Sequence, residues 1–135
     1  TRVTTNGERT IMVGEFMKNK AHSPKIIKKD WGQEVWMANN LENNYCGKII
    51  SIGPGCSTSL HFHSKKHETF FIVEGSLELH IIDTESTQEQ VICLEVGDTY
   101  VLERNVPHKL SSCQGCELIE ISTYHLNEDS YRISR

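Results

Sequence analysis

The sequence predicts an all-β protein whose strands form one sandwich or barrel. Runs of strand-forming residues recur about every eight to twelve positions, which is the spacing of these folds. The apolar residues show almost no helical periodicity, and glycine-containing turn signals separate several of the runs. A chain of 135 residues is long enough for one domain with one core. We therefore predict a single domain with an N-terminal strand region (1–30), a barrel core (31–124) and a C-terminal tail (125–135).

The expected strands of the first half are separated by clear turn signals. Trp31-Gly32 lies between two strand-like runs, and Gly53-Pro54-Gly55 is a strong turn signal at the end of a third. A loop is expected through residues 19–24. The strands expected in this half span residues 11–16, 26–29, 34–38, 45–52 and 59–63.

The second half continues the same pattern. Gly75 lies between two adjacent runs, as a tight hairpin would require, and Gly97-Asp98 separates the next pair. One helical turn is expected around residues 127–129 in the polar tail. The strands expected in this half span residues 68–74, 76–83, 90–94, 99–102, 106–110 and 117–123.

The composition is that of an ordinary globular protein and argues against several functions. Hydrophobic residues make up 37% of the chain and charged residues 24%. The formal net charge of −4 gives no basic surface for nucleic acid or for an anionic membrane, and no apolar run is long enough to cross a membrane. The N-terminus lacks a signal pattern and the number of cysteines is odd, at five. Both observations predict reduced thiols and a cytoplasmic protein.

Two of the cysteines, Cys113 and Cys116, have the spacing of zinc ligands. A structural zinc site needs four ligands, however, and the sequence has no second pair of this kind. The Gln-Gly pair between the two cysteines lies between strand-like runs, so we interpret this segment as a hairpin turn.

Three histidines and a glutamate have a spacing that favours a metal site. His61 and His63 are one residue apart on an expected strand, so their side chains lie on the same face, about 6–7 Å apart. Glu68 begins the next strand, and antiparallel pairing would bring its carboxylate back over the two imidazoles. His108 follows Pro107 at the start of a later strand. Such a set suits zinc, manganese, iron, nickel or cobalt, so the sequence predicts one divalent metal ion.

Two glycines complete a known pattern around these residues. Gly55, His61, His63, Glu68 and Gly75 occupy every defining position of the first motif of the cupin superfamily. The chain therefore resembles the small single-domain metal-binding cupins. This resemblance implies a double-stranded β-helix, or jelly-roll barrel. Such barrels are often dimeric through exchanged or paired N-terminal strands, so a homodimer is expected.

The second cupin motif is matched less completely. Gly97 and His108 keep its spacing, but Glu103 and Asn105 replace a proline and a glycine. These two replacements alter the loop before His108 but keep His108 itself. The resemblance implies that His108 is the fourth metal ligand.

A narrower resemblance, to the C-terminal cupin domain of type II mannose-6-phosphate isomerases, covers most of the chain. Those enzymes usually carry Gln where this chain has His61, and Arg where it has Lys66. Their full-length forms also contain a nucleotidyltransferase domain, which these residues do not include. D-Lyxose isomerase, another metal-dependent cupin, is similar around the metal motif and also places a lysine two residues before the glutamate. The segments that match the mannose-6-phosphate isomerases are residues 29–34, 59–63, 66–68, 107–110, 118–121 and 128–132.

The resemblance implies aldose–ketose isomerisation of a sugar or sugar phosphate, which requires a metal ion and a base. Lys66 is a candidate cation for sugar hydroxyls or phosphate, and a solvated turn lysine beside Lys65 is the equally supported alternative. His67 is a candidate proton shuttle, because an imidazole titrates near neutral pH. In a regular strand, however, its side chain would point away from that of Glu68. No residue stands out as the general base.

Several other residues have two open interpretations. Glu78 and His80 face solvent if the leucines between them form the core, which we favour, and face the metal otherwise. Trp31 is expected to cover one end of the barrel, and Arg132 either docks the tail or contacts a ligand. Three residues flank the expected His108 strand and either line the mouth of the barrel or are solvated: Tyr100, Arg104 and Lys109.

Two further functions fit the same sequence. A non-catalytic module that binds a sugar or another small molecule would explain why no base is evident. An iron-dependent dioxygenase would use the positions that three histidines and one glutamate leave open for oxygen and substrate.

Overall fold

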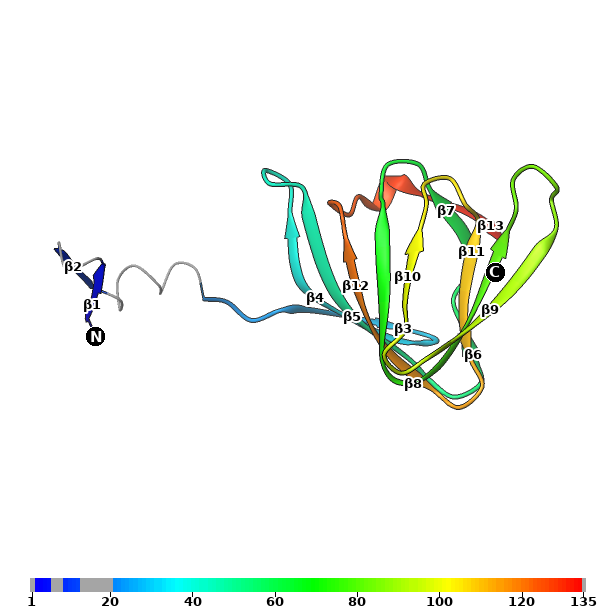
Figure 1. Ribbon diagram of the computed structural model, residues 1–135, viewed down its shortest axis with the longest axis horizontal. Coiled ribbons are helices and arrows are strands. Elements are labelled where there is room, and N and C mark those ends of the chain that lie inside the picture. Colours follow the sequence, from blue (N-terminus) through cyan, green and yellow to red (C-terminus); the bar gives the residue numbers. More distant parts are fainter. Residues whose placement is uncertain (1, 6–8, 13–20, 135) are drawn as a thin grey trace.

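The computed structural model describes residues 2–5, 9–12 and 21–134, whose regular structure is almost entirely β-strand (Figure 1). Strands β1 (Arg2–Thr5) and β2 (Arg9–Met12) pair with each other and with no other described strand. The strand expected at residues 11–16 begins within β2, and its part from residue 13 onward lies outside the described residues. The same is true of residues 19 and 20 in the expected loop.

The remaining strands form one antiparallel sheet that curls into an open barrel, as the sequence predicts (Figure 1). The first half of the sheet contains β3 (Lys25–Lys29), β4 (Gly32–Asn40), β5 (Tyr45–Ile52), β12 (Cys116–Ser122), the beginning of β8 (Glu68–Ile82) and β10 (Thr99–Leu102). The second half contains the end of β8 with β9 (Glu89–Glu95), β11 (His108–Ser112), β6 (Cys56–Ser57), β7 (Leu60–His63) and β13 (Ser130–Ser134).

Strand β8 links the two halves because it continues through Gly75 without reversing. Before Gly75 it pairs with β10 and β12, and after Gly75 it pairs with β9 and β11. The prediction of two strands joined by a hairpin at Gly75 is therefore wrong. The glycine has a φ of 77°, which bends the strand from one half of the sheet into the other.

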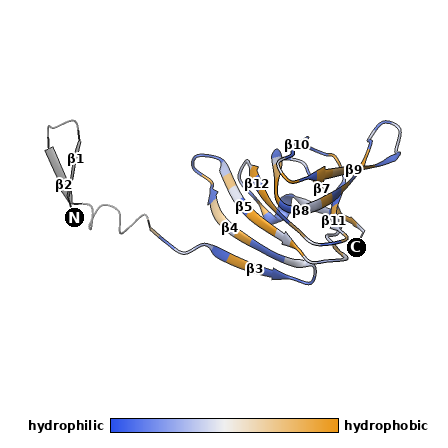
Figure 2. Ribbon diagram, turned by 60° about the horizontal axis from the view of Figure 1, so that its bottom comes forward, coloured by the Kyte–Doolittle hydropathy of each residue, from blue (hydrophilic) through white to orange (hydrophobic). Residues whose placement is uncertain are grey.

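Apolar side chains on the inward faces of the strands form the core. Burial alternates along β5 and β12, and Figure 2 shows hydrophobic and hydrophilic residues interspersed along β4 and β5. Leu77 and Leu79 are fully buried in the core. Glu78 and His80 do not line the cavity, so the alternative in which they face the metal is wrong, but both are half-buried. The largest core residues are Ile50, Ile52, Phe70, Ile72, Leu77, Leu79, Leu94, Leu102, Leu110 and Leu118.

The C-terminal tail is an edge strand of the barrel. The 3₁₀ turn η1 (Asn127–Asp129) forms where one helical turn was expected and is the only helix in the described part of the chain. Strand β13 then pairs with β7, with Ser130 opposite His63 and Arg132 opposite His61. The tail consequently lies beside the strand that carries two of the expected metal ligands.

Candidate metal centre

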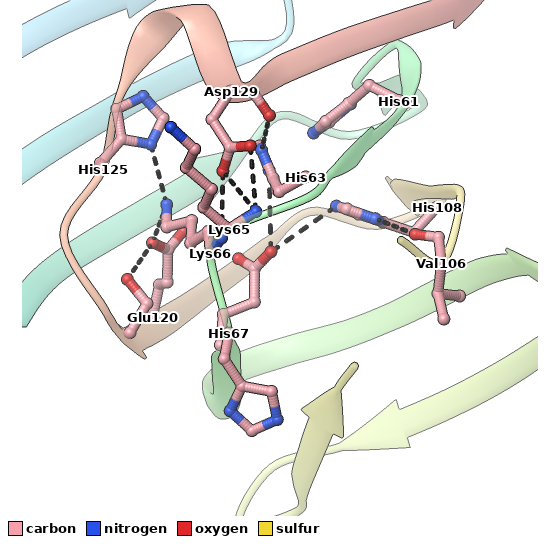
Figure 3. Close-up of polar contacts among 12 residues, drawn as sticks. His61, His63, Lys65, Lys66, His67, Val106, His108, Glu120, His125 and Asp129 are labelled. Atoms are coloured by element: carbon pink, nitrogen blue, oxygen red, sulfur yellow. Dashed lines mark hydrogen bonds and ion pairs between the residues drawn. The ribbon is translucent and has the colours of Figure 1, made fainter. Parts of the chain in front are cut away.

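The imidazoles of His61, His63 and His108 converge from two neighbouring strands (Figure 3). His61 and His63 share one face of β7, and His108 begins β11 directly opposite His61. The ring centroids are 4.5 Å apart for His61 and His108, 5.0 Å for His61 and His63, and 5.5 Å for His63 and His108. One nitrogen atom of each ring lies within 4.8 Å of the corresponding atoms of the other two. The structure thus brings together the three histidines that the sequence singled out.

Backbone carbonyls fix the same tautomer in all three rings. The Nδ1 atom of His61 donates to the Ser59 carbonyl at 2.9 Å, and that of His63 donates to the Asp129 carbonyl at 3.1 Å. The Nδ1 atom of His108 donates to the Val106 carbonyl at 3.0 Å. Because a carbonyl only accepts hydrogen bonds, each Nδ1 carries the proton and each Nε2 keeps a free lone pair. Metal-binding histidines are typically oriented in this way.

The three imidazoles are also held in the neutral form that a metal ion requires. Burial lowers the pKa of His108 to about 3 and, together with the Lys66 charge, lowers the pKa of His63 to about 4. Burial lowers the pKa of His61 as well. Near neutral pH all three rings can therefore donate a lone pair without first losing a proton.

The carboxylate of Glu68 lies next to two of these rings. Its Oε2 atom is 3.7 Å from Nε2 of His63 and 3.9 Å from Nε2 of His108. Burial, and then the neighbouring Glu120 charge, raise the pKa of Glu68 well above its usual range. A divalent cation among the rings would offset the desolvation of this carboxylate. Three imidazole nitrogens and one carboxylate suit manganese, iron, cobalt, nickel or zinc, so the donor set fits the expected metal.

The histidines line a cavity of about 320 Å³ whose wall has both polar and apolar parts. Trp31, Trp36 and Phe70 contribute aromatic surface, and Arg132 of β13 also lines the cavity. Trp31 and Arg132 therefore lie where ligand contact is possible, and Arg132 belongs to the docked tail as well. The charged residues of the cavity wall are Lys29, Asp30, Glu34, Lys48, Lys66, Glu68, Glu120 and Arg132.

Lys66 is buried in this cavity and is only 3% exposed. Its ammonium group forms an ion pair with the carboxylate of Glu120 and donates a hydrogen bond to Nδ1 of His125 at 2.9 Å (Figure 3). The alternative interpretation of Lys66 as a solvated turn residue is therefore wrong. Although burial acts to lower it, the charges of Glu120 and Glu68 raise the pKa of Lys66, so the ammonium form is stabilised.

Lys48 and Glu120 extend the charged wall from the neighbouring strands. They face each other across β5 and β12, and Nζ of Lys48 lies 3.2 Å from Oε1 of Glu34 and 4.1 Å from the Trp36 ring centroid. Although burial acts to raise it, Lys66 and Lys48 together lower the pKa of Glu120 to about 2. This part of the wall therefore contains two ion pairs, one between Lys48 and Glu34 and one between Lys66 and Glu120.

Sequence reasoning missed Lys48, Glu120 and His125 as site residues, although the first two leave a signal. Lys48 occupies the same strand parity as the buried residues Ile50 and Ile52, and Glu120 the same parity as Leu118. A charged residue at an inward position of a strand is rare unless it is paired or functional. His125 follows β12 in a loop and has no such periodic signal.

His67 lies outside the cavity. Its Nε2 atom is 3.0 Å from the Glu103 carboxylate, and its side chain is 33% exposed. Figure 3 shows the His67 ring pointing away from Lys66 and Glu120. Lys66 and Glu68 on either side line the cavity, whereas His67 does not. The structure therefore gives no support to His67 as a proton shuttle.

The remaining candidates lie away from the cavity. Cys113 is exposed in the turn between β11 and β12, and Cys116 is buried in the core. The segment is a turn, but the prediction of a hairpin is wrong, because β11 pairs with β6, β7 and β8 whereas β12 pairs with β5 and β8. Both thiols are free. Three of the residues considered for the mouth of the barrel do not line the cavity: Tyr100, Arg104 and Lys109.

Comparison with known families agrees with this geometry. The family model for the cupin domain matches residues 48–122, which include the three histidines and Glu68. The chain belongs to the cupin family. The matched segment of this cupin extends from Lys48 in β5 to Ser122 at the end of β12.

Solved structures similar to this cupin include bacterial oxalate decarboxylases. A variant of the Bacillus subtilis enzyme has a TM-score of 0.72 and 17% identity, covering 82% of this chain and 30% of that chain. The Lactobacillus farciminis enzyme in complex with formate has a TM-score of 0.70 and 19% identity, covering 82% of this chain and 34% of that chain. The Bacillus subtilis enzyme has Mn(II) centres. At these identities the likeness shows the fold alone, and this cupin spans about a third of the length of those enzymes.

Two further comparisons are negative. No curated protein sequence matches the chain significantly. Among the described residues, no helix combines the length and the apolar character needed to cross a membrane.

Proposed function

We propose that this cupin is a metal-dependent isomerase that interconverts an aldose and a ketose, with a sugar or sugar phosphate as substrate. The observation that carries the proposal is the buried ion pair between Lys66 and Glu120, which lies in the same cavity as the imidazoles. Isomerisation needs a base beside the metal ion, which Glu120 would supply, and Lys66 would supply a proton donor next to it. His61, His63, His108 and Glu68 would hold the metal ion.

Each group has a separate part in the proposed reaction. When bound, the metal ion supplies a Lewis acid that polarises the sugar carbonyl and the adjacent hydroxyl. The Lys66 ammonium gives a proton to the carbonyl oxygen as this oxygen gains negative charge, and it recovers a proton from the adjacent hydroxyl as the new carbonyl forms. The Glu120 carboxylate takes the proton from one carbon and returns it to the neighbouring carbon.

The basicity of Glu120 depends on Lys66 in this scheme. In the structure, Lys66 and Lys48 hold the pKa of Glu120 at about 2 against the effect of burial. A substrate oxygen that draws the Lys66 ammonium away from Glu120 would remove part of this stabilisation and raise that pKa. The carboxylate would thus become a stronger base when substrate is present.

The cavity supports a small polyhydroxylated substrate. Its volume of about 320 Å³ is at the lower end of the usual range for ligand sites. Trp31 and Trp36 offer apolar surface for a sugar ring, and Arg132 offers a cation for a phosphate or for hydroxyl groups. The resemblance of residues 29–34, 66–68 and 128–132 to mannose-6-phosphate isomerases supports the same substrate class.

Proton exchange at carbon tests the proposal directly. We expect the protein loaded with manganese, zinc or cobalt to incorporate deuterium from D₂O into one of a panel of aldoses, ketoses and their phosphates, as followed by NMR. Lys66→Met and Glu120→Gln should each slow the exchange by about 100-fold or more, because each removes one proton-handling group. The matched control is Lys65→Met, since Lys65 is exposed beside Lys66, and it should leave the rate unchanged.

Three outcomes would contradict the proposal. Sugar binding without exchange would favour the non-catalytic binding module. Oxygen uptake by the Fe(II)-loaded protein, without sugar isomerisation, would favour the dioxygenase. Equal exchange rates in Lys66→Met, Lys65→Met and the unmodified protein would show that the buried ion pair has no part in the reaction.

A further inference from the structure

The segment after β12 passes beside the metal centre and is tied to it by Asp129 (Figure 3). Asp129 ends the turn η1 immediately before β13 and is only 4% exposed. Its carboxylate points at the turn between β7 and β8, which joins the ligand His63 to Lys66.

The Asp129 carboxylate accepts hydrogen bonds from three consecutive backbone N–H groups of this turn. Oδ1 accepts from the N–H groups of Ser64 at 2.9 Å and Lys65 at 3.0 Å, and from the Ser64 hydroxyl at 2.8 Å. Oδ2 accepts from the N–H groups of Lys65 at 3.1 Å and Lys66 at 3.0 Å. One side chain thus fixes three consecutive backbone positions that lead into the cavity.

The backbone of the same residue fixes a metal ligand. The Asp129 carbonyl accepts the Nδ1 proton of His63 at 3.1 Å, and the next residue, Ser130, pairs with His63 in the register of β13 and β7. The carboxylate therefore determines where the Lys66 backbone lies, and the carbonyl determines the rotation of the His63 ring.

We propose that Asp129 is a positioning residue that sets the His63 imidazole and the Lys66 ammonium at the same time. The C-terminal segment is then part of the metal centre, and metal binding and docking of this segment stabilise each other. This coupling is reciprocal by thermodynamic linkage: if the docked tail increases the affinity for metal, bound metal must favour the docked tail to the same degree. The His63 part of the proposal stands independently of the proposed isomerisation, and the Lys66 part rests on it.

Binding of Co(II) provides a test that does not use catalysis. The visible absorption of Co(II) reports the geometry of its ligands, so we would titrate the full chain with Co(II) and record both the spectrum and the affinity. Asp129→Asn keeps the size of the side chain but replaces one acceptor oxygen by an NH₂ donor, which opposes the N–H groups of the turn. We expect it to weaken Co(II) binding by about tenfold or more and to change the spectrum.

Two further variants separate positioning from a general loss of stability. Glu128→Gln changes the preceding residue, which is exposed, and should keep the affinity and the spectrum of the unmodified protein. Ser64→Ala removes a single hydrogen bond to Asp129 and should give a smaller loss of affinity, even if Asp129→Asn folds poorly. Circular dichroism checks that each variant is folded.

Hydrogen exchange followed by mass spectrometry measures the coupling itself. We expect Co(II) to slow amide exchange in residues 126–134 of the unmodified protein and to have less effect on these residues in the Ser64→Ala variant. The proposal is overturned if folded Asp129→Asn binds Co(II) with unchanged affinity and spectrum, or if Co(II) leaves exchange in the tail unaltered. If no sugar is isomerised but Asp129→Asn still weakens Co(II) binding and changes the spectrum, only the proposed isomerase function is contradicted.

Discussion

The three histidines differ from surface histidines because each is largely buried and gives its Nδ1 proton to a backbone carbonyl. When no metal ion is bound, keeping these buried imidazoles neutral destabilises the folded protein by an amount that depends on pH. The folded protein resists protonation of His63 down to a pKa of about 4 and of His108 down to about 3. In the unfolded chain both residues take up a proton near the usual histidine pKa.

The stability of the metal-free protein should therefore fall on acidification. From about pH 7 to about pH 5 the unfolded state binds more protons than the folded state, so the free energy of unfolding decreases as the pH falls. Urea titrations at several pH values in this range measure the slope. The replacement His108→Gln should reduce the slope, because it removes one of the groups responsible. A free energy of unfolding that is constant or rises on acidification would contradict the burial of neutral imidazoles.

Residue spacing was sufficient to predict the candidate ligands but not the rest of the cavity. His61 and His63 alternate on one strand, and this local regularity is visible in the sequence. Glu120 meets Lys66 only because β12 pairs with β8, and this pairing joins segments that are far apart in the chain. Strand parity would have singled out Glu120 as an inward charge, but the partner that neutralises it depends on the register of the sheet.

At the scale of the elements, β8 shows that a glycine inside a continuous strand can be mistaken for a turn. The segments on both sides of Gly75 were predicted as strands, but a glycine between them was interpreted as a hairpin turn. In the structure the strand continues, and a Cβ atom at Gly75 would lie 2.1 Å from the carbonyl oxygen of Gly115. A positive φ suits both a turn and a bend within a strand, so local sequence did not distinguish them.

Gly75→Ala should therefore be strongly destabilising. The added methyl group meets backbone at a position whose φ of 77° already disfavours other residues, and we expect a loss of more than about 2 kcal/mol. Gly97→Ala is the matched control, since Gly97 has a φ of 90° but no atom within 4 Å of the point that an added Cβ would occupy. It should cost about 1 kcal/mol, because only the backbone conformation is unfavourable. Equal losses in urea unfolding would contradict the close approach of β8 to Gly115.

The tail was the element least accessible to sequence reasoning. Its short 3₁₀ turn was expected, but the strand at residues 130–134 was not, although Tyr131 and Ile133 alternate with polar residues. Their position is set by long-range contacts, namely the pairing of β13 with β7 and the stacking of Tyr131 on Phe62, whose ring centroids are 5.0 Å apart.

At the scale of the whole molecule, the barrel contains an apolar core and a cavity that meet at Ile50, Phe70 and Leu110, which belong to both. Apolar residues fill one part of its interior, while the histidines and paired charges line the cavity in the other part. The spacing of the strand-like runs predicted a sandwich or barrel, and the resemblance to the cupin motif narrowed this expectation to a jelly-roll barrel. The homodimer and the cytoplasmic location expected from the sequence remain predictions.

The central claim is that this cupin holds one divalent metal ion through His61, His63, His108 and Glu68. Elemental analysis of protein purified without chelator tests it most directly, with His61→Ala and His108→Ala beside the control His80→Ala, which changes a histidine outside the cavity. We predict about one metal ion per chain in the unmodified protein and in His80→Ala, and loss of the metal in both cavity variants. Absence of metal from the unmodified protein, even after each candidate ion is added back, would contradict the account.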